Sequence, residues 1–225
     1  MRRLQPGAGG PVDLATVYGG ADRLRPSDRP WITMLMIGSA DGAAVVDGRS
    51  GALGGPGDQV VYRVVRSLGD GVLAGAATAR TERYQPLPPP RRLYIVTSTG
   101  DLGASVDLLT APTTTLVMPT DAATPAAASV DIVRAGVGHV DLGGALAQLH
   151  GVDHLICEGG PTINGQLLAA GLVDEVCLSL APRFVAGDSS RIAHSSSVAP
   201  LDEWHLADVL ADGNFLFLRY LRPGR

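Results

Sequence analysis

The strongest chemical signal in the sequence is the segment LICEGGPTING at residues 155–165. An apolar run leads into Glu158 and a glycine pair, and Pro161 then stands where proline favours the first position of a helix. Adjacent glycines let a ligand approach the main chain, and the free amides at a helix N-terminus attract anions. The segment therefore predicts a diphosphate-binding turn, although a strand-to-helix turn without a ligand has the same pattern. Its glycines lack the spacing of a Rossmann fingerprint and come late in the chain, which disfavours a standard dinucleotide-binding domain.

Three other turns carry small or hydroxyl-bearing residues directly after short apolar runs. Asp41 lies in the turn SADG, Thr78 lies in GAATARTE, and Ser98 belongs to TSTG. Because open α/β sheets bind ligands beyond the carboxyl ends of their strands, these turns together favour a cofactor groove. Each one alone is also an ordinary turn, since these residue types favour turns for backbone reasons.

The remaining reactive side chains do not form a recognisable site. His150, His154 and Cys157 are metal-ligand types, but Gly151 and the apolar strand around His154 interrupt the helix that would align them. We therefore favour a structural role for these residues and expect no metal. Cys157 and Cys177 lie in apolar runs and are interpreted as reduced, buried thiols. The histidine spacing supports neither a Ser/His/Asp triad nor a Cys/His pair.

The composition excludes several classes of protein. Among the 225 residues, 45% are hydrophobic and 18% are charged, which is the balance of a folded chain with a substantial core. All 18 basic residues are arginine, so a Walker A loop, a pyridoxal Schiff base and a lysine nucleophile are excluded. A net charge of −4 and few aromatic residues argue against nucleic acid as a partner. No apolar run has the length of a membrane helix or an export signal, so we expect a cytoplasmic protein without a membrane partner.

The elements that must position these residues alternate between strands and helices. Short apolar runs predict strands over residues 31–37, 71–74, 93–97, 116–118, 130–133, 154–157 and 173–180. Helical spacing predicts helices over residues 56–68, 142–149 and 161–170. Residues 204–210 and 215–221 flank a turn at 212–214 and predict a closing antiparallel hairpin. The expected fold is therefore α/β with a mostly parallel, mixed sheet.

The sequence suggests one domain preceded by an arm. Residues 1–28 are rich in Gly, Pro, Arg and Asp, and we interpret them as an N-terminal arm that lies over the domain outside its core. Residues 29–223 show no internal repeat and no second core, so we expect them to form a single domain.

Four segments of the chain resemble a known family. RPWITMLMIGSADG, VVRSLGDGVLAGAATARTERY, ICEGGPTINGQLLAAGLVDEVCLSLAP and LADVLADGNFLFLRY are similar, in this order, to the C-terminal reductase domain of bifunctional riboflavin biosynthesis proteins and to stand-alone pyrimidine reductase family proteins. The resemblance spans about residues 29–222. It implies a dihydrofolate-reductase-like, three-layer α/β/α fold, NADPH as cofactor and a homodimer. Riboflavin-pathway members reduce the ribosyl group of a 5-amino-6-ribosylaminouracil phosphate to ribityl.

The same resemblance implies roles for individual residues. It implies that NADPH contacts Gly38, Ala52, Gly75, Thr78, Glu82, Ser98, Gly159, Gly160, Pro161, Thr162 and Ile163, with the diphosphate at residues 159–163 and the 2′-phosphate near Ser98. It implies that the substrate contacts Ser50, Arg66 and Glu158. We expect Asp41 or Glu158, with Glu158 preferred, to supply a carboxylate that anchors the heterocycle or helps to protonate it.

Two departures from the family leave the substrate open. Where the family often has Ser-Leu-Asp-Gly followed by Lys or Arg, this chain has Ala40 and Ala43, so phosphate recognition is weakened or moved to Arg49 or Arg66. The sequence also lacks the zinc-ligand motifs of a deaminase, so we expect reduction only. A pterin or dihydrofolate-type reductase on the same fold and a non-catalytic NADPH-binding protein remain alternatives.

Overall fold

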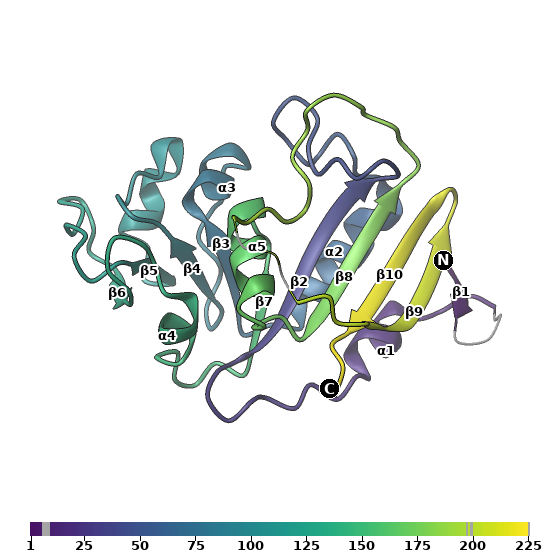
Figure 1. Cartoon of the computed structure of the whole chain (residues 1–225), viewed down its shortest axis with the longest axis horizontal. Coiled ribbons are helices and arrows are strands. Elements are labelled where there is room, and N and C mark those ends of the chain that lie inside the picture. Colours follow the sequence, from purple (N-terminus) through teal and green to yellow (C-terminus); the bar gives the residue numbers. More distant parts are fainter. Residues whose placement is uncertain (6–9, 197, 199, 225) are drawn as a thin grey trace.

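The computed structural model describes residues 1–5, 10–196, 198 and 200–224, and within them one sheet of ten strands carries helices on both faces (Figure 1). The strands are β1 (Arg2–Gln5), β2 (Trp31–Ser39), β3 (Gly71–Gly75), β4 (Arg92–Val96), β5 (Thr114–Met118), β6 (Asp131–Arg134), β7 (His154–Cys157), β8 (Glu175–Ala181), β9 (His205–Asp212) and β10 (Phe215–Leu221). The helices are α1 (Leu14–Gly19), α2 (Pro56–Ser67), α3 (Ala76–Thr81), the 3-10 helix η1 (Gly103–Leu109), α4 (Leu142–Leu146) and α5 (Pro161–Ala169). None of these helices is long and apolar enough to span a membrane.

The sheet is mostly parallel and ends in an antiparallel hairpin, as the sequence predicts. The strand order is β1-β9-β10-β8-β2-β7-β3-β4-β5-β6. The pairs from β8 to β6 are parallel, whereas β10 pairs antiparallel with both β8 and β9. The β9–β10 turn holds Gly213 at a φ of +55°, a left-handed conformation that glycine adopts without strain.

The alternation of side chains along the strands divides the molecule into three layers. In β3, Leu73 packs in one apolar cluster with Leu146 of α4 and Leu167 of α5. The neighbouring residue Val72 packs in another cluster with Leu108 of η1 and with α3. Because successive side chains of a strand point to opposite faces, α4 and α5 cover one face of the sheet and α3 and η1 cover the other. This is the predicted α/β/α arrangement.

Helix α2 is the element that the sequence predicts best. Pro56 occupies its start, and the buried side chains of Val61 and Val65 pack with Leu35 of β2 and Cys177 of β8. Helix α4 is shorter than expected, because it ends at Leu146 instead of residue 149. Two glycines within its five residues lower its helix propensity and account for the early end.

The N-terminal segment contributes to the core, which corrects the expectation of an arm outside it. β1 pairs with β9 and forms one edge of the sheet, and Leu14, Val17 and Tyr18 of α1 are buried in the apolar cluster that contains residues of α2. Their i, i+3, i+4 spacing forms one apolar face of a helix that Asp13 caps. The segment is therefore attached by packing as well as by strand pairing.

A buried cluster of charges also holds this segment. Glu175 of β8 is fully buried and receives Arg23 Nε at 2.7 Å, Arg219 Nε at 2.5 Å and the Thr33 hydroxyl at 2.7 Å. Burial raises the pKa of Glu175, but the hydrogen bonds and charges of the two arginines outweigh it and lower the pKa to about 2. The carboxylate is therefore ionised at neutral pH.

This cluster predicts that replacing Arg23 with Ala destabilises the protein by about 3 kcal/mol, because the variant leaves buried Glu175 with one cation instead of two. The matched control is Arg25→Ala. Its ion pair with Asp153 at 3.2 Å is exposed, so its loss costs below about 1 kcal/mol. Urea unfolding at neutral pH measures both variants. Equal losses of stability would show that the Glu175 cluster does not hold the N-terminal segment.

Candidate functional site

A cavity of about 750 Å³ opens beyond the carboxyl ends of the central strands. Leu35, Met36 and Ile37 of β2 form its floor, and residues that follow β3 and β7 lie along its sides. Helix α2, the loop at residues 44–54 and the segment at residues 84–91 complete the wall. The cavity therefore lies where parallel α/β sheets bind ligands.

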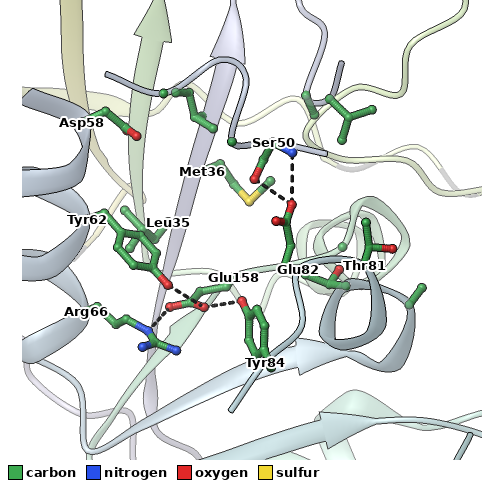
Figure 2. Close-up of a pocket in the computed structure, with 18 of the residues that line it drawn as sticks. Leu35, Met36, Ser50, Asp58, Tyr62, Arg66, Thr81, Glu82, Tyr84 and Glu158 are labelled. Carbon is green, nitrogen blue, oxygen red and sulfur yellow. Dashed lines mark hydrogen bonds and ion pairs between the residues drawn. The ribbon is translucent and has the colours of Figure 1, made fainter. Parts of the chain in front are cut away.

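At one end of this cavity, Glu158 accepts three hydrogen bonds (Figure 2). Arg66 Nε lies 2.6 Å from Oε1, while the hydroxyls of Tyr62, at 3.3 Å, and Tyr84 donate to Oε2. The guanidinium carbon of Arg66 lies 5.5 Å from the ring centre of Tyr62 and 5.9 Å from that of Tyr84. We call these four residues the Glu158 cluster. Ion pairing and cation–π contacts together fix the orientation of each member.

The electrostatics of the cluster keep its donors protonated. Burial and the negative charge of Glu158 raise the pKa values of Tyr62 and Tyr84 above the ordinary range. Burial alone would lower the pKa of Arg66, but the charge and hydrogen bond of Glu158, together with the two phenols, outweigh it and raise the pKa. At neutral pH the two phenols therefore act as donors and the guanidinium stays charged.

A second interaction, between Ser50 and Glu82, joins two other segments of the cavity wall. The Ser50 amide and hydroxyl donate to Glu82 Oε1 at 3.0 and 2.9 Å. Ser50 belongs to the loop at residues 44–54, which is rich in glycine, and Glu82 directly follows α3. The two hydrogen bonds therefore join the loop to the C-terminal end of α3 at the cavity wall.

The turn between β7 and α5 has the geometry of an anion cradle. The Gly75 amide donates to the Gly159 carbonyl at 2.7 Å, which brings the β3–α3 and β7–α5 turns together. A Cβ at Gly160 would lie 2.8 Å from Thr78 Oγ1, so only glycine leaves this space open. The amides of Thr162 and Ile163 lie in the first turn of α5, where helices have no internal acceptors. These residues fit a diphosphate.

The structure brings together seven of the residues that the sequence singled out. The residues that line the cavity are Ser50, Arg66, Thr78, Glu82, Glu158, Gly160 and Pro161. Four other predicted residues do not line the cavity, although they belong to the two turns or to the first turn of α5. They are Gly75, Gly159, Thr162 and Ile163.

Three other predicted residues do not line this cavity, namely Gly38, Ala52 and Ser98. Gly38 is buried in β2 close to the Ala43 carbonyl, and Ala52 and Ser98 are exposed. Ser98 nevertheless follows β4, which is paired with β3, so it stands one strand away from the cradle. Contacts of these three residues with a cofactor stay predictions.

Asp41 has a different environment from the one expected of a catalytic carboxylate. Its side chain accepts the amides of Val185 and Ala186 at 2.9 and 2.8 Å together with the Ser39 hydroxyl, and it does not line the cavity. These hydrogen bonds, that of Ser39 foremost, lower the pKa of Asp41 to about 2. Asp41 therefore holds the chain at residues 185–186 against the end of β2, and of the two carboxylates only Glu158 lines the cavity.

Asp58, Tyr62 and Tyr84 are polar residues of the cavity wall that the sequence analysis did not single out. The predicted helix contained the signal for two of them, because Asp58, Tyr62 and Arg66 are spaced four residues apart and so share one helix face. Tyr84 follows α3 in an irregular segment. No periodicity there could have indicated its position.

Comparison with known proteins places the chain in a family. The family model described as the RibD C-terminal domain matches residues 30–216. The chain belongs to the RibD C-terminal domain family. This membership confirms the resemblance read from the sequence.

Individual relatives of this RibD C-terminal domain protein agree with that placement. A pyrimidine reductase-like protein from Corynebacterium diphtheriae is 22% identical with a TM-score of 0.80, and the alignment covers 95% of this chain and all of that one. Dihydrofolate reductase from Enterococcus faecalis, complexed with NADP(H), is 14% identical with a TM-score of 0.56 over 86% of this chain and 96% of its own. These likenesses confirm the dihydrofolate-reductase-like fold.

One curated relative has higher identity over a short stretch. It is the 2,5-diamino-6-ribosylamino-4(3H)-pyrimidinone 5′-phosphate reductase of Methanothermobacter thermautotrophicus, which is 44% identical over 63 residues. The matched stretch is 27% of this chain and spans only 29% of that relative.

The Glu158 cluster predicts that Tyr84→Phe lowers the free energy of unfolding by about 1.5 kcal/mol, because it removes a hydrogen bond to a buried carboxylate. Tyr62→Phe is the matched control, since its longer bond of 3.3 Å to the same oxygen contributes less. Thermal unfolding of both variants measures the difference. A larger loss in Tyr62→Phe would contradict this description of the cluster.

Proposed function

We propose that this protein is an NADPH-dependent reductase that transfers a hydride to a pyrimidine-type heterocycle of the 5-amino-6-ribosylaminouracil phosphate kind. The observation that carries the proposal is the shared cavity: Gly160 and Thr78 of the cradle and the Glu158 cluster line the same 750 Å³. A dinucleotide held on the cradle and a polar substrate held by Glu158 and Arg66 would therefore meet. The name of the Methanothermobacter relative supports a pyrimidine substrate.

The residues that would hold the cofactor belong to neighbouring strand ends. The amides of residues 160–163 suit the diphosphate, and Thr78 offers a hydroxyl beside them. Ser98, one strand further along the sheet, is the candidate for the 2′-phosphate. When bound, the nicotinamide supplies the hydride, so the protein itself needs to orient the reactants and manage charge.

The chain's own contribution to the reaction comes from the Glu158 cluster. Glu158 fixes Arg66, whose remaining guanidinium N–H groups are available to acceptor atoms of a substrate. Tyr62 and Tyr84 hold the carboxylate of Glu158 in one orientation. Charged side chains held in fixed orientations lower the free-energy cost of positioning a polar heterocycle beside a hydride donor. We also propose, from family resemblance, that the enzyme works as a cytoplasmic homodimer.

A dihydrofolate-type substrate is the second candidate, because the fold likeness extends to dihydrofolate reductase. Calorimetric titration with NADPH tests the cofactor, and NADPH oxidation with 5-amino-6-ribosylaminouracil 5′-phosphate or dihydrofolate tests the substrate. We expect NADPH binding and faster oxidation with the pyrimidine. Faster oxidation with dihydrofolate would support the second candidate. Binding without oxidation by either would indicate a non-catalytic NADPH-binding protein, and no binding would refute both reductase proposals.

Replacing Glu158 with Gln tests the role of the carboxylate. We expect kcat to fall by about 100-fold, because Gln removes the charge that holds Arg66, whereas NADPH affinity stays unchanged. Glu203→Gln, a change at an exposed position outside the cavity, is the control and should leave both quantities unaltered. An unchanged kcat in the Glu158 variant would remove this residue from the mechanism.

A further inference from the structure

One side of the neighbouring strands β8, β10 and β9 has only apolar side chains over two adjacent rows. The pairing register puts three residues in each row, and the rows are Leu178, Leu218 and Val209, then Leu180, Leu216 and Ala211. We call these six residues the apolar face. In Figure 1, α4 and α5 lie in front of other strands on this side, and no described helix lies in front of β8 and β10. Helices therefore leave this side of the two strands uncovered.

The charged side chains of the same strands lie on the opposite side. Glu175, Arg219 and Asp208 alternate with the apolar face along the strands, and Arg219 forms buried ion pairs with Glu175 at 2.5 Å and with Asp208 at 3.0 Å. Phe217 and Leu210 of this side pack with α1 and α2. An antiparallel sheet with one face in water usually turns its polar residues toward the water. The polarity is reversed here, so the apolar face does not have the pattern of a solvated surface.

The described part of the chain does not bury the apolar face. Beside it, Val176 belongs to a core cluster against which Tyr220 and Trp204 pack, so the chain itself covers that next row. Four members of the apolar face are partly exposed and belong to none of the three apolar clusters of the described residues, namely Leu180, Val209, Leu216 and Leu218. The positions outside the description are single residues or a run of four, too short to cover three strands. Contiguous exposed apolar surface of this kind marks an interaction site.

The chemistry of the apolar face favours a second copy of this chain as the partner. The face has no charged side chain, so a two-fold axis can bring two copies of it together without opposing like charges. Flat sheets also stack face to face at about 10 Å through aliphatic side chains of this kind. A membrane surface would require basic side chains, and a polar partner would require donors or acceptors, and the apolar face provides neither.

The extent of the surface also suits such a contact. Three strands spaced by about 4.8 Å make the apolar face about 14 Å wide. A standard interface buries about 800 Å² on each partner, with an apolar centre inside a wider rim. Phe184 beyond β8 and Leu201 before β9 are 82% and 96% exposed. Because β8 and β9 run in the same direction, these two residues extend the apolar surface at opposite ends of the strands.

We propose that the apolar face is the interface of a symmetric dimer in which the β8-β10-β9 sheets of two copies pack face to face. The inference rests on the homodimer of the proposed function and assigns the surface that forms it. None of the six residues lines the cavity, so each subunit keeps its own cavity open. Assembly can therefore be disrupted without changing a residue of the candidate site.

The test is the oligomeric state of the full chain, measured by sedimentation velocity over a range of concentrations. We expect the wild type to have twice the mass of the chain. Leu218→Arg should raise the dimer dissociation constant by at least about 100-fold, because each copy would bury an unpaired charge in the interface. Leu218 is on the central strand of the three, and its partly exposed side chain leaves room for the change in the separate subunit.

The control is Val106→Arg, which makes the same change at an exposed position of η1, on the other side of the sheet, and should remain dimeric. Leu216→Glu is a second interface variant in case Leu218→Arg does not fold, and it should also be monomeric. A monomeric wild type would overturn the proposal, as would folded interface variants that stay dimeric. Calorimetric titration of the wild type with NADP⁺ separates the two claims. Its failure would count against the proposed reductase, while sedimentation would still decide the role of the apolar face.

Discussion

The candidate site depends on the close approach of two turns. The hydrogen bond from the Gly75 amide to the Gly159 carbonyl joins the end of β3 to the end of β7, and the absent side chain at Gly160 leaves room beside Thr78. Without this approach, the first turn of α5 and the carboxylate of Glu158 would not face one cavity. Parallel pairing of β3 and β7 makes it possible, because it puts both carboxyl ends at the same edge of the sheet.

Burial and partners place three acidic residues in three different environments. Glu175 is fully buried and neutralised by two arginines, so it stabilises the fold. Glu158 is nearly buried, but its partners line a cavity, so the same kind of ion pair forms part of the cavity wall. Asp58 is half-buried and forms no ion pair with an arginine or histidine of the described residues. The two arginines lower the pKa of Glu175, whereas burial raises that of Asp58.

Sequence reasoning succeeded where local rules and tertiary structure agree. Pro56 and Pro161 marked the starts of α2 and α5, and the apolar runs marked the central strands. The prediction for the N-terminal segment was wrong, because contacts between residues far apart in the sequence determine where that segment lies. The apolar patch of α1 is short, and its burial depends on packing with α2 and on the pairing of β1 with β9.

In the candidate site, too, local sequence patterns indicated some residues, whereas long-range contacts place the others. The position of Glu158 and Gly160 in the cavity wall could be predicted, because an apolar run, a glycine pair and a proline follow one another in the sequence. Tyr84 reaches Glu158 across 74 positions of chain from an irregular segment, so only the folded structure places it in the cluster. Asp41 has the residue type and turn position of a site carboxylate, but it accepts hydrogen bonds from the amides of Val185 and Ala186 and does not line the cavity, so its catalytic role stays a prediction.

A crystal structure of the protein with NADP⁺ is the most direct test of the cofactor site. We expect electron density for the diphosphate within hydrogen-bonding distance of the main-chain amides of Gly160, Thr162 and Ile163, with the nicotinamide in the cavity that Glu158 lines. Density for the dinucleotide elsewhere on the sheet, with the β7–α5 turn free of it, would contradict this expectation.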